Sequence, residues 1–391
     1  MPVLPQDEIH LQRALDLAQA AVGLASPNPT VGCVLTSPTG QLLGEGAHHY
    51  DAFDHAEIAA LKQAAALGHS VAGATAYITL EPCAHHGRTG PCSDALIAAG
   101  ITRCVVAAID PNPLTRNKGL AKLRDAGLTV DVAGRNSPQA KQARELNDAF
   151  AFAIQNQRPF VTLKSAVSLD GKIAPAPSTR SEVSPHWLTG PDARESVQPM
   201  RHASDVLFTG VGTVLADDPS LTDRSGLPRR RPLLRIIFDS ALRTPLNAKA
   251  LAGGNIALVC AEYASEDRGT ALKAAGAEIW RLPTEANRPN IHLTLRKLYE
   301  ELKMTSVLVE AGTGLTDALL QRNLVDRVVL YYADTELGTD AIPFSTRFPS
   351  PYKLQESLSE VTRSTFPHGD PIGTEDDVRI TGYLHNPWAK V

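Results

Sequence analysis

TLEPCAHHGRTGPCSDALIAAG, residues 79–100, decides the fold of the first third of the chain. Its apolar start completes a predicted strand over 74–80, its middle is a loop with two cysteines, and its end is a helix over 93–100 closed by a glycine. The same alternation continues on both sides of this stretch and predicts an open sheet with helices on both faces. We expect further strands at 30–36, 104–109 and 128–132 and helices near 11–22, 55–67 and 118–126.

The rest of the chain repeats this α/β pattern as a second domain. Ser137 and Pro138 favour a helix start, and this helix is expected to run to about Asn156. We place the domain boundary inside it, which gives domains 1–147 and 148–391. Strands are expected at 160–163, 205–210, 233–240, 255–260, 278–282, 306–312 and 327–333, with helices at 293–302 and 315–321.

Composition narrows the class of protein. A chain of 391 residues is long for one core, so two domains are expected. The net charge of −4 does not favour a nucleic-acid partner or an anionic membrane surface. No apolar run approaches the roughly 20 residues that span a bilayer, and the N-terminal stretch lacks the pattern of a signal peptide. Five cysteines without a regular framework indicate a reducing compartment, so we expect a cytoplasmic protein.

His55, Cys83 and Cys92 form a candidate zinc site. A His-x-Glu pair or two cysteines alone would carry little information, because free cysteines are common in cores and such pairs arise by chance. Here His55 and Glu57 open one helix, and Cys92 precedes another, whose positive end favours a thiolate. Three ligands leave the fourth tetrahedral position of Zn²⁺ for water, and Glu57 is placed to carry a proton of that water.

A closed, structural zinc site is the alternative. His85 or His86 would then supply a fourth protein ligand, and the ion would hold the fold without catalysing a reaction. Such a domain could serve as a binding module for nucleic acid, but the acidic balance and the lack of a basic stripe count against this. Glu57, two residues from His55, favours the catalytic site.

The motifs resemble those of a known family. H-x-E followed later by P-C and a second cysteine is typical of zinc nucleobase deaminases, with two residues between the cysteines, whereas eight stand between Cys83 and Cys92 here. With that longer loop, PNPTVGCVL, HAE, TLEPCAHHGRTGPC and DPNP resemble the deaminase half of the bifunctional riboflavin-biosynthesis family, which joins a pyrimidine deaminase to a pyrimidine reductase. LKSAVSLDGKIA, WLTGPDAR, TGVGTVLADDPSLT and VEAG resemble the reductase half, in the expected order.

For the first domain, the resemblance implies a cytidine-deaminase-like, three-layer α/β/α fold. The implied substrate is a diaminohydroxypyrimidine with a phosphoribosylamino group. Zinc would be held by the same three ligands, and Glu57 would pass the proton to departing ammonia.

Three nearby residues need separate treatment. Asn28 matches a substrate-contacting position, since an amide can pair with a pyrimidine edge, although a turn residue between two prolines explains it equally well. His48 is either a further contact or a surface histidine. Asp54 stands where the family usually has a proline, and we expect it to cap the helix and to orient the His55 imidazole.

For the second domain, the resemblance implies a dihydrofolate-reductase-like α/β fold that binds NADPH and transfers hydride to the ring-opened ribose. No G-x-G-x-x-G follows the first strand, so a Rossmann domain is not indicated, but VEAGTGLTDALL is a strand, turn and helix start suited to phosphate. The implied cofactor positions are Ala166, Trp187, Thr213, Asp217, Ser240, Gly312, Thr313, Gly314, Leu315, Thr316, Asp317 and Ala318. The implied substrate positions are Ser184, Arg201, Leu221, Arg224 and Glu310.

The arginines suit a phosphorylated substrate, because a guanidinium binds phosphate through two hydrogen bonds. A surface ion pair is the alternative for each of them. Lys164 and Asp170 are family-like, and we expect them to order loops near the site.

Several departures from the family affect the second domain. The loop between Lys172 and Trp187 is long and proline-rich, Pro185 replaces a serine so that Ser184 is one step further away, and the glycine-proline turn is changed at Thr313. We expect weakened binding before lost chemistry, and the alternative is a deaminase with a degenerate, non-catalytic reductase-like domain. The expected partners are phosphorylated pyrimidines, with no nucleic acid and no membrane, and the chain is expected to form a homo-oligomer, a dimer or tetramer.

Overall fold

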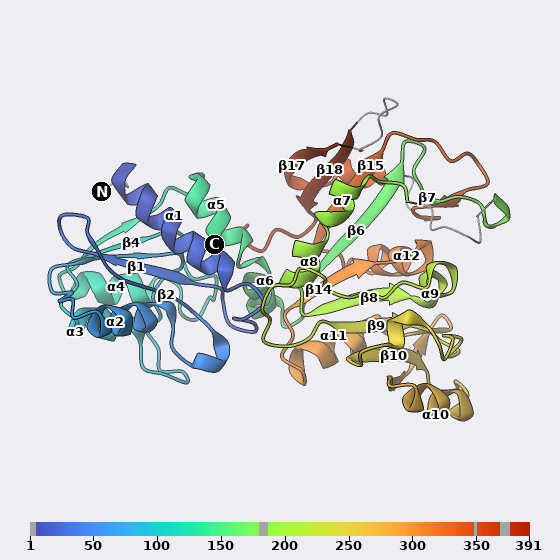
Figure 1. The fold of residues 1–391 in the computed structure, drawn as a ribbon, viewed down its shortest axis with the longest axis horizontal. Helices are drawn as coiled ribbons and strands as arrows, with labels where there is room; N and C mark the ends of the chain where they lie inside the picture. Colours follow the sequence, from blue (N-terminus) through green and yellow to red (C-terminus); the bar gives the residue numbers. More distant parts are fainter. Residues whose placement is uncertain (1–4, 180–186, 348–349, 368–375) are drawn as a thin grey trace. The chain divides into compact units, whose positions relative to one another are not determined.

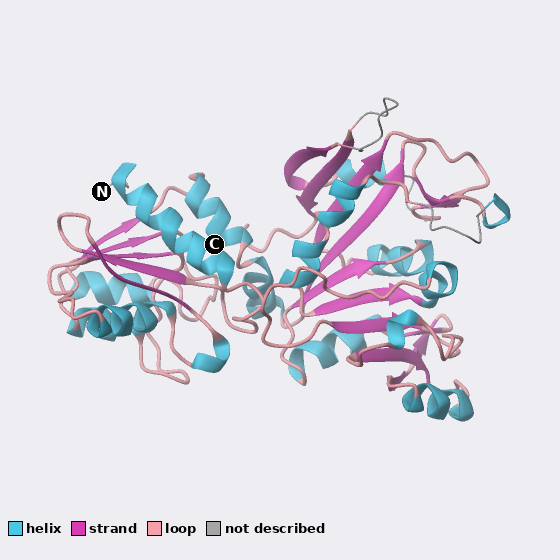
Figure 2. Cartoon of the chain, in the orientation of Figure 1, coloured by secondary structure: helices cyan, strands magenta, loops and turns pink. Residues whose placement is uncertain are grey.

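The computed structural model of the chain describes residues 5–179, 187–347, 350–367 and 376–391 (Figure 1). The chain folds into two compact units. The first comprises Met1–Arg158, Pro228–Arg231 and Pro387–Val391, and the second comprises Pro159–Leu227 and Pro232–Asn386. Figure 2 shows that each unit has a central sheet with helices against it.

The sheet of the first unit has five strands in the order β2-β1-β3-β4-β5. β1 pairs antiparallel with β2 and β3, while β3, β4 and β5 are parallel. The strands are β1 (Gly32–Thr36), β2 (Leu42–Ala47), β3 (Thr75–Ile78), β4 (Arg103–Val106) and β5 (Thr129–Val132). The helices are α1 (Pro5–Ala20), α2 (Ala56–Ala66), α3 (Cys92–Ala98), α4 (Lys118–Asp125), α5 (Pro138–Glu145) and α6 (Asp148–Asn156).

These helices form the outer layers of a three-layer α/β/α unit. α1 and α5 lie together on one face of the sheet, and α2, α3 and α4 cover the other (Figure 1). The inner strands β1, β3 and β4 are apolar runs because the helices bury both faces of the sheet there, as the fully buried β1 shows. The predicted open sheet with helices on both faces is therefore present.

A buried ion network fastens α1 to the sheet. Arg103 on β4 donates two hydrogen bonds to Asp7 on α1, at 2.7 and 2.9 Å, and its Nε donates to Asp131 on β5 at 2.9 Å. The Tyr77 hydroxyl donates to Asp7 at 3.0 Å. Asp7 and Asp131 are buried, so the charges of the two carboxylates need this arginine.

β2 was not predicted, and its glycines explain why. The strand LLGEGA lacks the β-branched and aromatic residues that mark a strand. The glycines are required because α2 lies directly on it: a Cβ at Gly44 would be 2.5 Å from the carbonyl oxygen of Ala60, and one at Gly46 would be 2.6 Å from Cβ of Ala59. Close packing of α2 on β2 thus removed the sequence signal for the strand.

The single helix predicted from Ser137 to about Asn156 is wrong, because two helices stand there. Ser137 does cap α5, accepting from the backbone N–H of Ala140. The helix breaks at Asn147, whose side chain accepts from the N–H of Thr30 and donates to the carbonyl oxygens of Thr30 and Ala143. These bonds join the break to the loop before β1.

The compact units also differ from the predicted division at residue 147. α6 belongs to the first unit, where Ala151 is part of the hydrophobic core. Residues 387–391 belong there as well: Trp388 is buried in the same core, and its indole N–H donates to Asp148 at 2.9 Å. Arg135 donates to the carbonyl oxygens of Trp388 and Val391.

The described part of the second unit has a nine-stranded sheet in the order β11-β10-β9-β8-β14-β6-β15-β18-β17. All neighbours are parallel from β11 to β15, and β18 and β17 continue the sheet antiparallel. The sheet strands are β6 (Phe160–Ser168), β8 (Val206–Gly210), β9 (Leu234–Phe238), β10 (Ile256–Ala261), β11 (Glu278–Leu282), β14 (Ser306–Glu310), β15 (Arg327–Ala333), β17 (Ser359–Phe366) and β18 (Asp377–Tyr383).

Three hydrophobic clusters lie in the described part of this unit: one with α11 and α12, one with α9 and α10, and a smaller one where α7 packs on β15. The helices are α7 (Pro191–Glu195), α8 (Gln198–Ala203), α9 (Val211–Asp217), α10 (Glu266–Ala274), α11 (Ile291–Glu300), α12 (Thr313–Gln321) and α13 (Pro351–Glu356). Short strands form two further pairs: β7 (Lys172–Ala174) with β16 (Ile342–Pro343), and β12 (Thr284–Glu285) with β13 (Arg288–Pro289).

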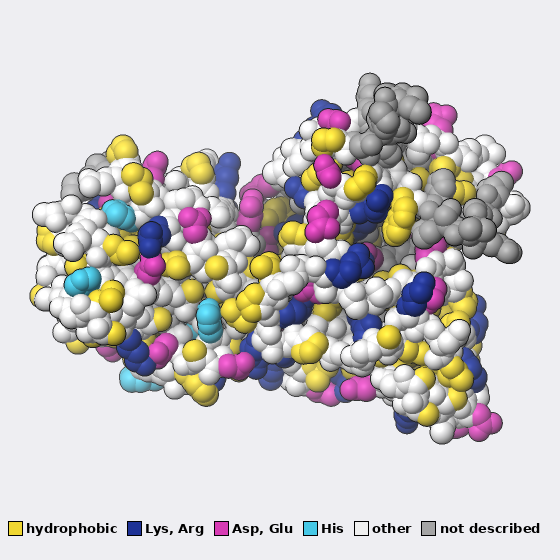
Figure 3. Space-filling model, viewed as in Figure 1, with side chains coloured by type: hydrophobic (Ala, Val, Ile, Leu, Met, Phe, Trp, Pro, Cys, Tyr) yellow, Lys and Arg dark blue, Asp and Glu magenta, His cyan; other side chains and the backbone are white. Residues whose placement is uncertain are grey.

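Each predicted strand and helix of the second domain has a counterpart, and β17 and β18 are additional. β17 is exposed along most of its length and has a polar sequence, SEVTRSTF, so it has no apolar run to mark it. Among the described residues, none of the helices combines the length and the apolar character needed to cross a bilayer. On the face drawn in Figure 3, basic and acidic side chains of the described residues are interspersed.

Candidate active sites

The three predicted zinc ligands lie together in the first unit. The ligand atoms of His55, Cys83 and Cys92 are all within 4.8 Å of one another. His55 Nδ1 is 3.6 Å from the Cys83 sulfur and 3.3 Å from that of Cys92. One imidazole nitrogen and two thiol sulfurs at these separations are a donor set that suits Zn²⁺.

Helix starts and a short loop create this grouping. His55 is the N-cap residue of α2, and Cys92 is the first residue of α3, so both face the positive ends of helices. The backbone N–H of Cys92 donates to the Cys83 sulfur at 3.2 Å, and that of Ser93 donates to the carbonyl oxygen of Cys83 at 3.1 Å. A hydrogen bond from Cys92, aided by His55, lowers the pKa of the Cys83 thiol.

Glu57 lies beside these ligands in the first turn of α2 and is 3% exposed. Burial raises the pKa of its carboxyl group to about 7, the Cys83 thiol adds to this effect, and His55 opposes it. Hydrogen bonding with the Cys92 thiol also acts against burial and lowers this pKa. The residue predicted to carry protons is thus held within reach of the ligand group.

The two histidines proposed as alternative ligands lie elsewhere. His85 and His86 are exposed, and neither belongs to the group of ligand atoms found among the described residues. The described part of the first unit therefore offers a set of three ligand residues next to a buried carboxyl group.

Asn28 and His48 lie next to this group. The Asn28 amide nitrogen is 3.1 Å from His48 Nε2, and His48 Nδ1 is 2.7 Å from the carbonyl oxygen of Asp54. The His48 ring stands edge-on to that of His55, with ring centroids 5.2 Å apart. His48 is buried, so the alternative of a surface histidine is wrong.

The role predicted for Asp54 is also wrong. His55 is the N-cap of α2, and the Asp54 carboxylate instead forms an ion pair with Lys62, at 2.7 and 2.9 Å. Asp54 acts near the site only through its backbone carbonyl, which holds His48. A side-chain prediction failed because the helix begins one residue later than a cap at Asp54 requires.

In the second unit, Arg201 and Glu310 face each other. Arg201 Nε and Nη2 donate to the two carboxylate oxygens of Glu310 at 2.7 and 2.8 Å, and Nη1 donates to the carbonyl oxygen of Thr222 at 2.9 Å. The predicted two-point contact of Arg201 is therefore made to Glu310 itself. Burial favours the neutral acid, but Arg201, Lys164 and Arg224 outweigh it and lower the pKa of Glu310.

Lys164 and Arg224 complete a cationic group around Glu310. Lys164 is paired with Glu310 across β6 and β14, and burial lowers the pKa of its ammonium group. Arg224 is exposed, so its guanidinium is accessible to solvent. Asp170, by contrast, orders a loop: its carboxylate accepts from the backbone N–H groups of Leu337 and Gly338 and from the Ser168 hydroxyl.

The implied cofactor positions gather at the carboxyl ends of neighbouring parallel strands. Open α/β sheets bind ligands at this edge. β8 leads into α9, with Thr213 and Asp217 one turn apart, and β14 leads into α12, whose N-cap is Gly312. A Cβ at Gly312 would be 3.9 Å from the Thr213 hydroxyl, so the two helix starts are adjacent. Ser240 follows β9, the strand on the other side of β8, and Ala166 lies towards the end of β6.

Within α12, the altered turn still presents a helix start. Gly312, Thr313 and Gly314 are not buried, and the first turn of a helix leaves backbone N–H groups for an anion. Asp317 points elsewhere, because its carboxylate accepts hydrogen bonds from Ser345 and Thr346. Leu315, Thr316 and Ala318 are buried.

The remaining positions differ in exposure. Trp187 is 63% exposed, with the Arg194 guanidinium 5.0 Å from its ring centroid. Leu221 is buried in a hydrophobic cluster and has a positive φ of 56°, which few leucines adopt. Ser184 and Pro185 lie outside the described residues.

Comparisons with known proteins cover both units. The family model for the RibD C-terminal domain matches residues 159–363, and the model for the cytidine and deoxycytidylate deaminase zinc-binding region matches residues 4–108. The chain belongs to the RibD family. Riboflavin biosynthesis protein RibD of Aquifex aeolicus is 39% identical over 332 residues, or 85% of this chain and 88% of that protein. RibD of Escherichia coli (strain K12) is 38% identical over 348 residues, or 86% and 90%.

RibD structures confirm the fold of both units. Acinetobacter baumannii RibD, form 1, is 34% identical and has a TM-score of 0.73, with 97% of this chain and 98% of that chain covered. A Thermotoga maritima deaminase/reductase structure is 28% identical, with a TM-score of 0.76 and the same coverage. The predicted combination of a cytidine-deaminase-like domain and a reductase domain is correct.

As a RibD, the chain is a bifunctional deaminase and reductase of riboflavin biosynthesis, and its cofactors are Zn²⁺ and NADPH. The alternative of a degenerate reductase-like domain receives no support from these comparisons. Family models match both halves of the chain.

Two RibD residues near the zinc ligands were missed by the sequence analysis. Arg88, in the loop between the cysteines, places its guanidinium 4.2 Å from the ring centroid of Tyr50 and 4.0 Å from that of Phe53. Glu81, two residues before Cys83, is 6% exposed and accepts four backbone hydrogen bonds. An acid directly before Pro-Cys was the only signal for Glu81.

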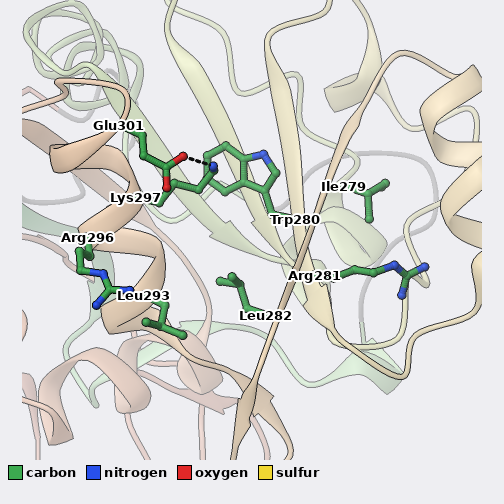
Figure 4. Close-up of a pocket in the computed structure, with 8 residues that line it drawn as sticks. All are labelled: Ile279, Trp280, Arg281, Leu282, Leu293, Arg296, Lys297 and Glu301. Carbon is green, nitrogen blue, oxygen red and sulfur yellow. Dashed lines mark hydrogen bonds and ion pairs between the residues drawn. The ribbon is translucent and has the colours of Figure 1, made fainter.

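A cavity of about 350 Å³ lies away from the predicted positions, between the edge strand β11 and α11 (Figure 4). Trp280 lies on one side, with the Lys297 ammonium 5.3 Å from its ring centroid, and Lys297 pairs with Glu301. These charged groups are satisfied locally, and none of the lining residues belongs to the implied cofactor or substrate positions.

Proposed function

We propose that the first unit deaminates 2,5-diamino-6-(5-phosphoribosylamino)pyrimidin-4-one and that the second reduces the ribose of the product, 5-amino-6-(5-phosphoribosylamino)uracil, to a ribityl chain. The Thermotoga maritima structure is described as a diaminohydroxyphosphoribosylaminopyrimidine deaminase and 5-amino-6-(5-phosphoribosylamino)uracil reductase. The observation that carries the proposal for this chain is the buried Glu57 carboxyl group beside three zinc-ligating side chains.

In the first unit, His55, Cys83 and Cys92 hold zinc, and Glu57 moves the protons. Zinc supplies the Lewis acidity that makes water reactive near neutral pH. Glu57 takes a proton from the attacking water and delivers it to the amino group, which leaves as ammonia. The Asn28 amide, held by His48, is positioned to pair with the edge of the pyrimidine ring.

In the second unit, the two arginines have different tasks. Arg224, which is exposed, binds the substrate phosphate, because a guanidinium matches its oxygens. Arg201 keeps Glu310 ionised and oriented, so that Glu310 can contact the sugar. Leu221 and Ser184 complete the proposed substrate positions.

The cofactor positions fit a nucleotide with phosphates. NADPH supplies the hydride, and the start of α12 offers backbone N–H groups to its phosphates. Thr213, Asp217 and Ser240 lie beside that helix start, and Ala166 and Trp187 are assigned to the nicotinamide end. This division keeps the phosphate sites of cofactor and substrate on separate elements.

We also propose a cellular location and an oligomeric state for the enzyme. The five cysteines are all free thiols, which supports a reducing compartment such as the cytoplasm. A homo-oligomer, dimer or tetramer, remains our expectation, and sedimentation of the purified chain tests it.

Zinc content and coupled turnover test the central assignment. We expect about one zinc ion per chain, bound by three protein ligands. Anomalous diffraction at the zinc edge will identify them, and His85 or His86 as a fourth ligand would end the deaminase assignment. The purified chain should release ammonia from the diaminopyrimidine without NADPH, and should consume NADPH only once the deaminated product is present.

A further inference from the structure

We infer that Glu81 is a positioning residue for the zinc site, which it holds in place through the backbone of Pro82 and Cys83. This inference rests on the proposed assignment of Cys83 as a zinc ligand. Among the described residues, the hydrogen bonds of the Glu81 carboxyl group go to backbone N–H groups before and at the start of α4, not to the ligand atoms. Its effect therefore has to pass through the chain that joins it to Cys83.

The first observation is a carboxylate surrounded by backbone donors. One oxygen of Glu81 accepts from the N–H groups of Gly119 and Leu120 at 3.0 and 3.3 Å. The other accepts from those of Asp110 and Asn117 at 3.1 and 3.0 Å. The four donors occupy both oxygens of one buried carboxyl group, whereas an amide offers only one oxygen.

The second observation is that α4 lacks its own cap. Its N-cap residue, Asn117, has a left-handed conformation, and in the described structure its side chain makes no capping hydrogen bond. Gly119 and Leu120 are the second and third residues of α4, whose N–H groups an N-cap side chain normally satisfies. Glu81, distant in sequence, supplies this cap instead.

The third observation is contact between α4 and the residue before Cys83. A Cβ at Gly119 would lie 1.9 Å from the carbonyl oxygen of Pro82, so the helix start lies directly on that peptide. Glu81 itself is fixed by its N–H bond to the carbonyl oxygen of Ala108 at 2.9 Å. The backbone that leads to Cys83 is therefore held from both sides.

Cys83 passes this constraint to the other ligands. Its carbonyl oxygen and sulfur accept the N–H groups of Ser93 and Cys92, and its sulfur is 3.6 Å from His55 Nδ1. If Glu81 loses two of its four bonds, the Cys83 thiolate can shift relative to the other two ligands. Metal geometry should change before the fold of the unit does.

The test is Glu81→Gln in the full chain, with cobalt in place of zinc as a spectroscopic probe. We expect altered cobalt d–d and thiolate charge-transfer bands, faster release of zinc to a chelator, and a deamination kcat at least about tenfold lower with little change in KM. NADPH consumption with deaminated substrate should stay at the wild-type level, which shows that the chain is folded. Glu81→Asp keeps both carboxyl oxygens but shortens the side chain, and it should show the same changes to a smaller degree. This variant tests the inference if Glu81→Gln does not fold.

The matched control is Leu123→Ala, which removes a buried side chain from the same helix without touching Glu81. If its cobalt spectrum and zinc release match those of the Glu81 variants at equal loss of Tm, Glu81 has only a structural role and the inference is wrong. Wild-type spectra and zinc release in both Glu81 variants would overturn it as well. Failure of the wild-type chain to bind cobalt through thiolates would instead contradict the proposed zinc site.

Discussion

Glu57 in the first unit and Glu310 in the second are both largely enclosed carboxyl groups, yet their pKa values shift in opposite directions. Burial dominates at Glu57, whose neighbours are two thiols and an imidazole, and raises its pKa to about 7. At Glu310 the cations Arg201, Lys164 and Arg224 overcome burial and lower the pKa. The same residue type is thus prepared to exchange a proton in one unit and to remain ionised in the other.

Removal of the first carboxyl group should have the largest effect. In Glu57→Gln we expect deamination to fall about 10²–10⁴-fold, because the amide cannot carry a proton. Zinc content should be unchanged, since the three ligands remain. Ammonia release from the diaminopyrimidine measures the loss, and NADPH consumption with deaminated substrate is the internal control. Near wild-type ammonia release would falsify the role of Glu57.

Arg201→Ala should have the next largest effect, on stability as well as on activity. Loss of one partner leaves Glu310 enclosed without its main cation, which typically costs about 3–5 kcal/mol in the free energy of unfolding. Urea denaturation of the full chain should show this loss in the transition of the second unit. The double variant Arg201→Ala with Glu310→Ala should be less destabilised than the single one, because no charge is then stranded. Equal stability of the two variants would contradict this account.

The pH dependence of that loss has a definite sign. In the wild-type chain the folded pKa of Glu310 lies below its ordinary value of 4.5, so its ionisation stabilises the fold above about pH 4.5, and this contribution is lost as pH falls through the lowered pKa. The difference in unfolding free energy between the wild type and Arg201→Ala should therefore shrink as the pH falls below about 4.5. A difference that stays constant as the pH falls below about 4.5 would show that Arg201 does not hold Glu310 in its ionised form.

Arg224→Ala should act mainly on substrate binding, since Arg224 is the last of the causes that lower the pKa of Glu310. A charge-assisted hydrogen bond is worth about 1.5–3 kcal/mol, so KM for the phosphorylated substrate should rise about tenfold to a hundredfold. The Kd for NADPH should not change, because Arg224 is not among the cofactor positions. Arg296→Ala is the matched control: it removes an exposed arginine beside the cavity of Figure 4 and should leave both constants unaltered.

The smallest effect is expected for Lys62→Ala. In the ion pair between Lys62 and Asp54 the lysine is exposed and the aspartate half-buried, and such surface pairs contribute about 0–1 kcal/mol. Thermal unfolding and deamination should both stay close to wild type. A large loss of deamination would restore the side-chain role for Asp54 that the structure removes.

The zinc site could be predicted from the sequence because it is local. His55 and Glu57 lie at the start of α2, and Cys83 and Cys92 lie at the two ends of one loop. The spacing within the motif therefore indicates that the residues of each pair are close together. Features that depend on packing between segments distant in the sequence have no local motif that predicts them. β2 was not predicted because its glycines, which allow α2 to pack closely, are not typical of a strand. The cap that Glu81 provides for α4 joins segments far apart in the sequence.

The second site was predicted through resemblance, and its detail needed the structure. The positions from Ala166 to Ala318 are spread over several strands, and only the order of the sheet brings their carboxyl ends together. Arg201 was expected to bind phosphate because arginine commonly does so, yet its donors are taken by Glu310. The partner of a side chain is a property of the fold, which the residue type cannot specify.

The position of Trp388 in the core of the first unit has a practical consequence for dissection of this enzyme. A gene cut at residue 158 would produce a deaminase fragment without Trp388, whose indole fills a buried place next to Asp148. That fragment would expose the apolar surface that Trp388 covers, and we expect it to aggregate for reasons unrelated to catalysis. Intact chains with one site silenced by a point substitution are the sound way to measure each activity.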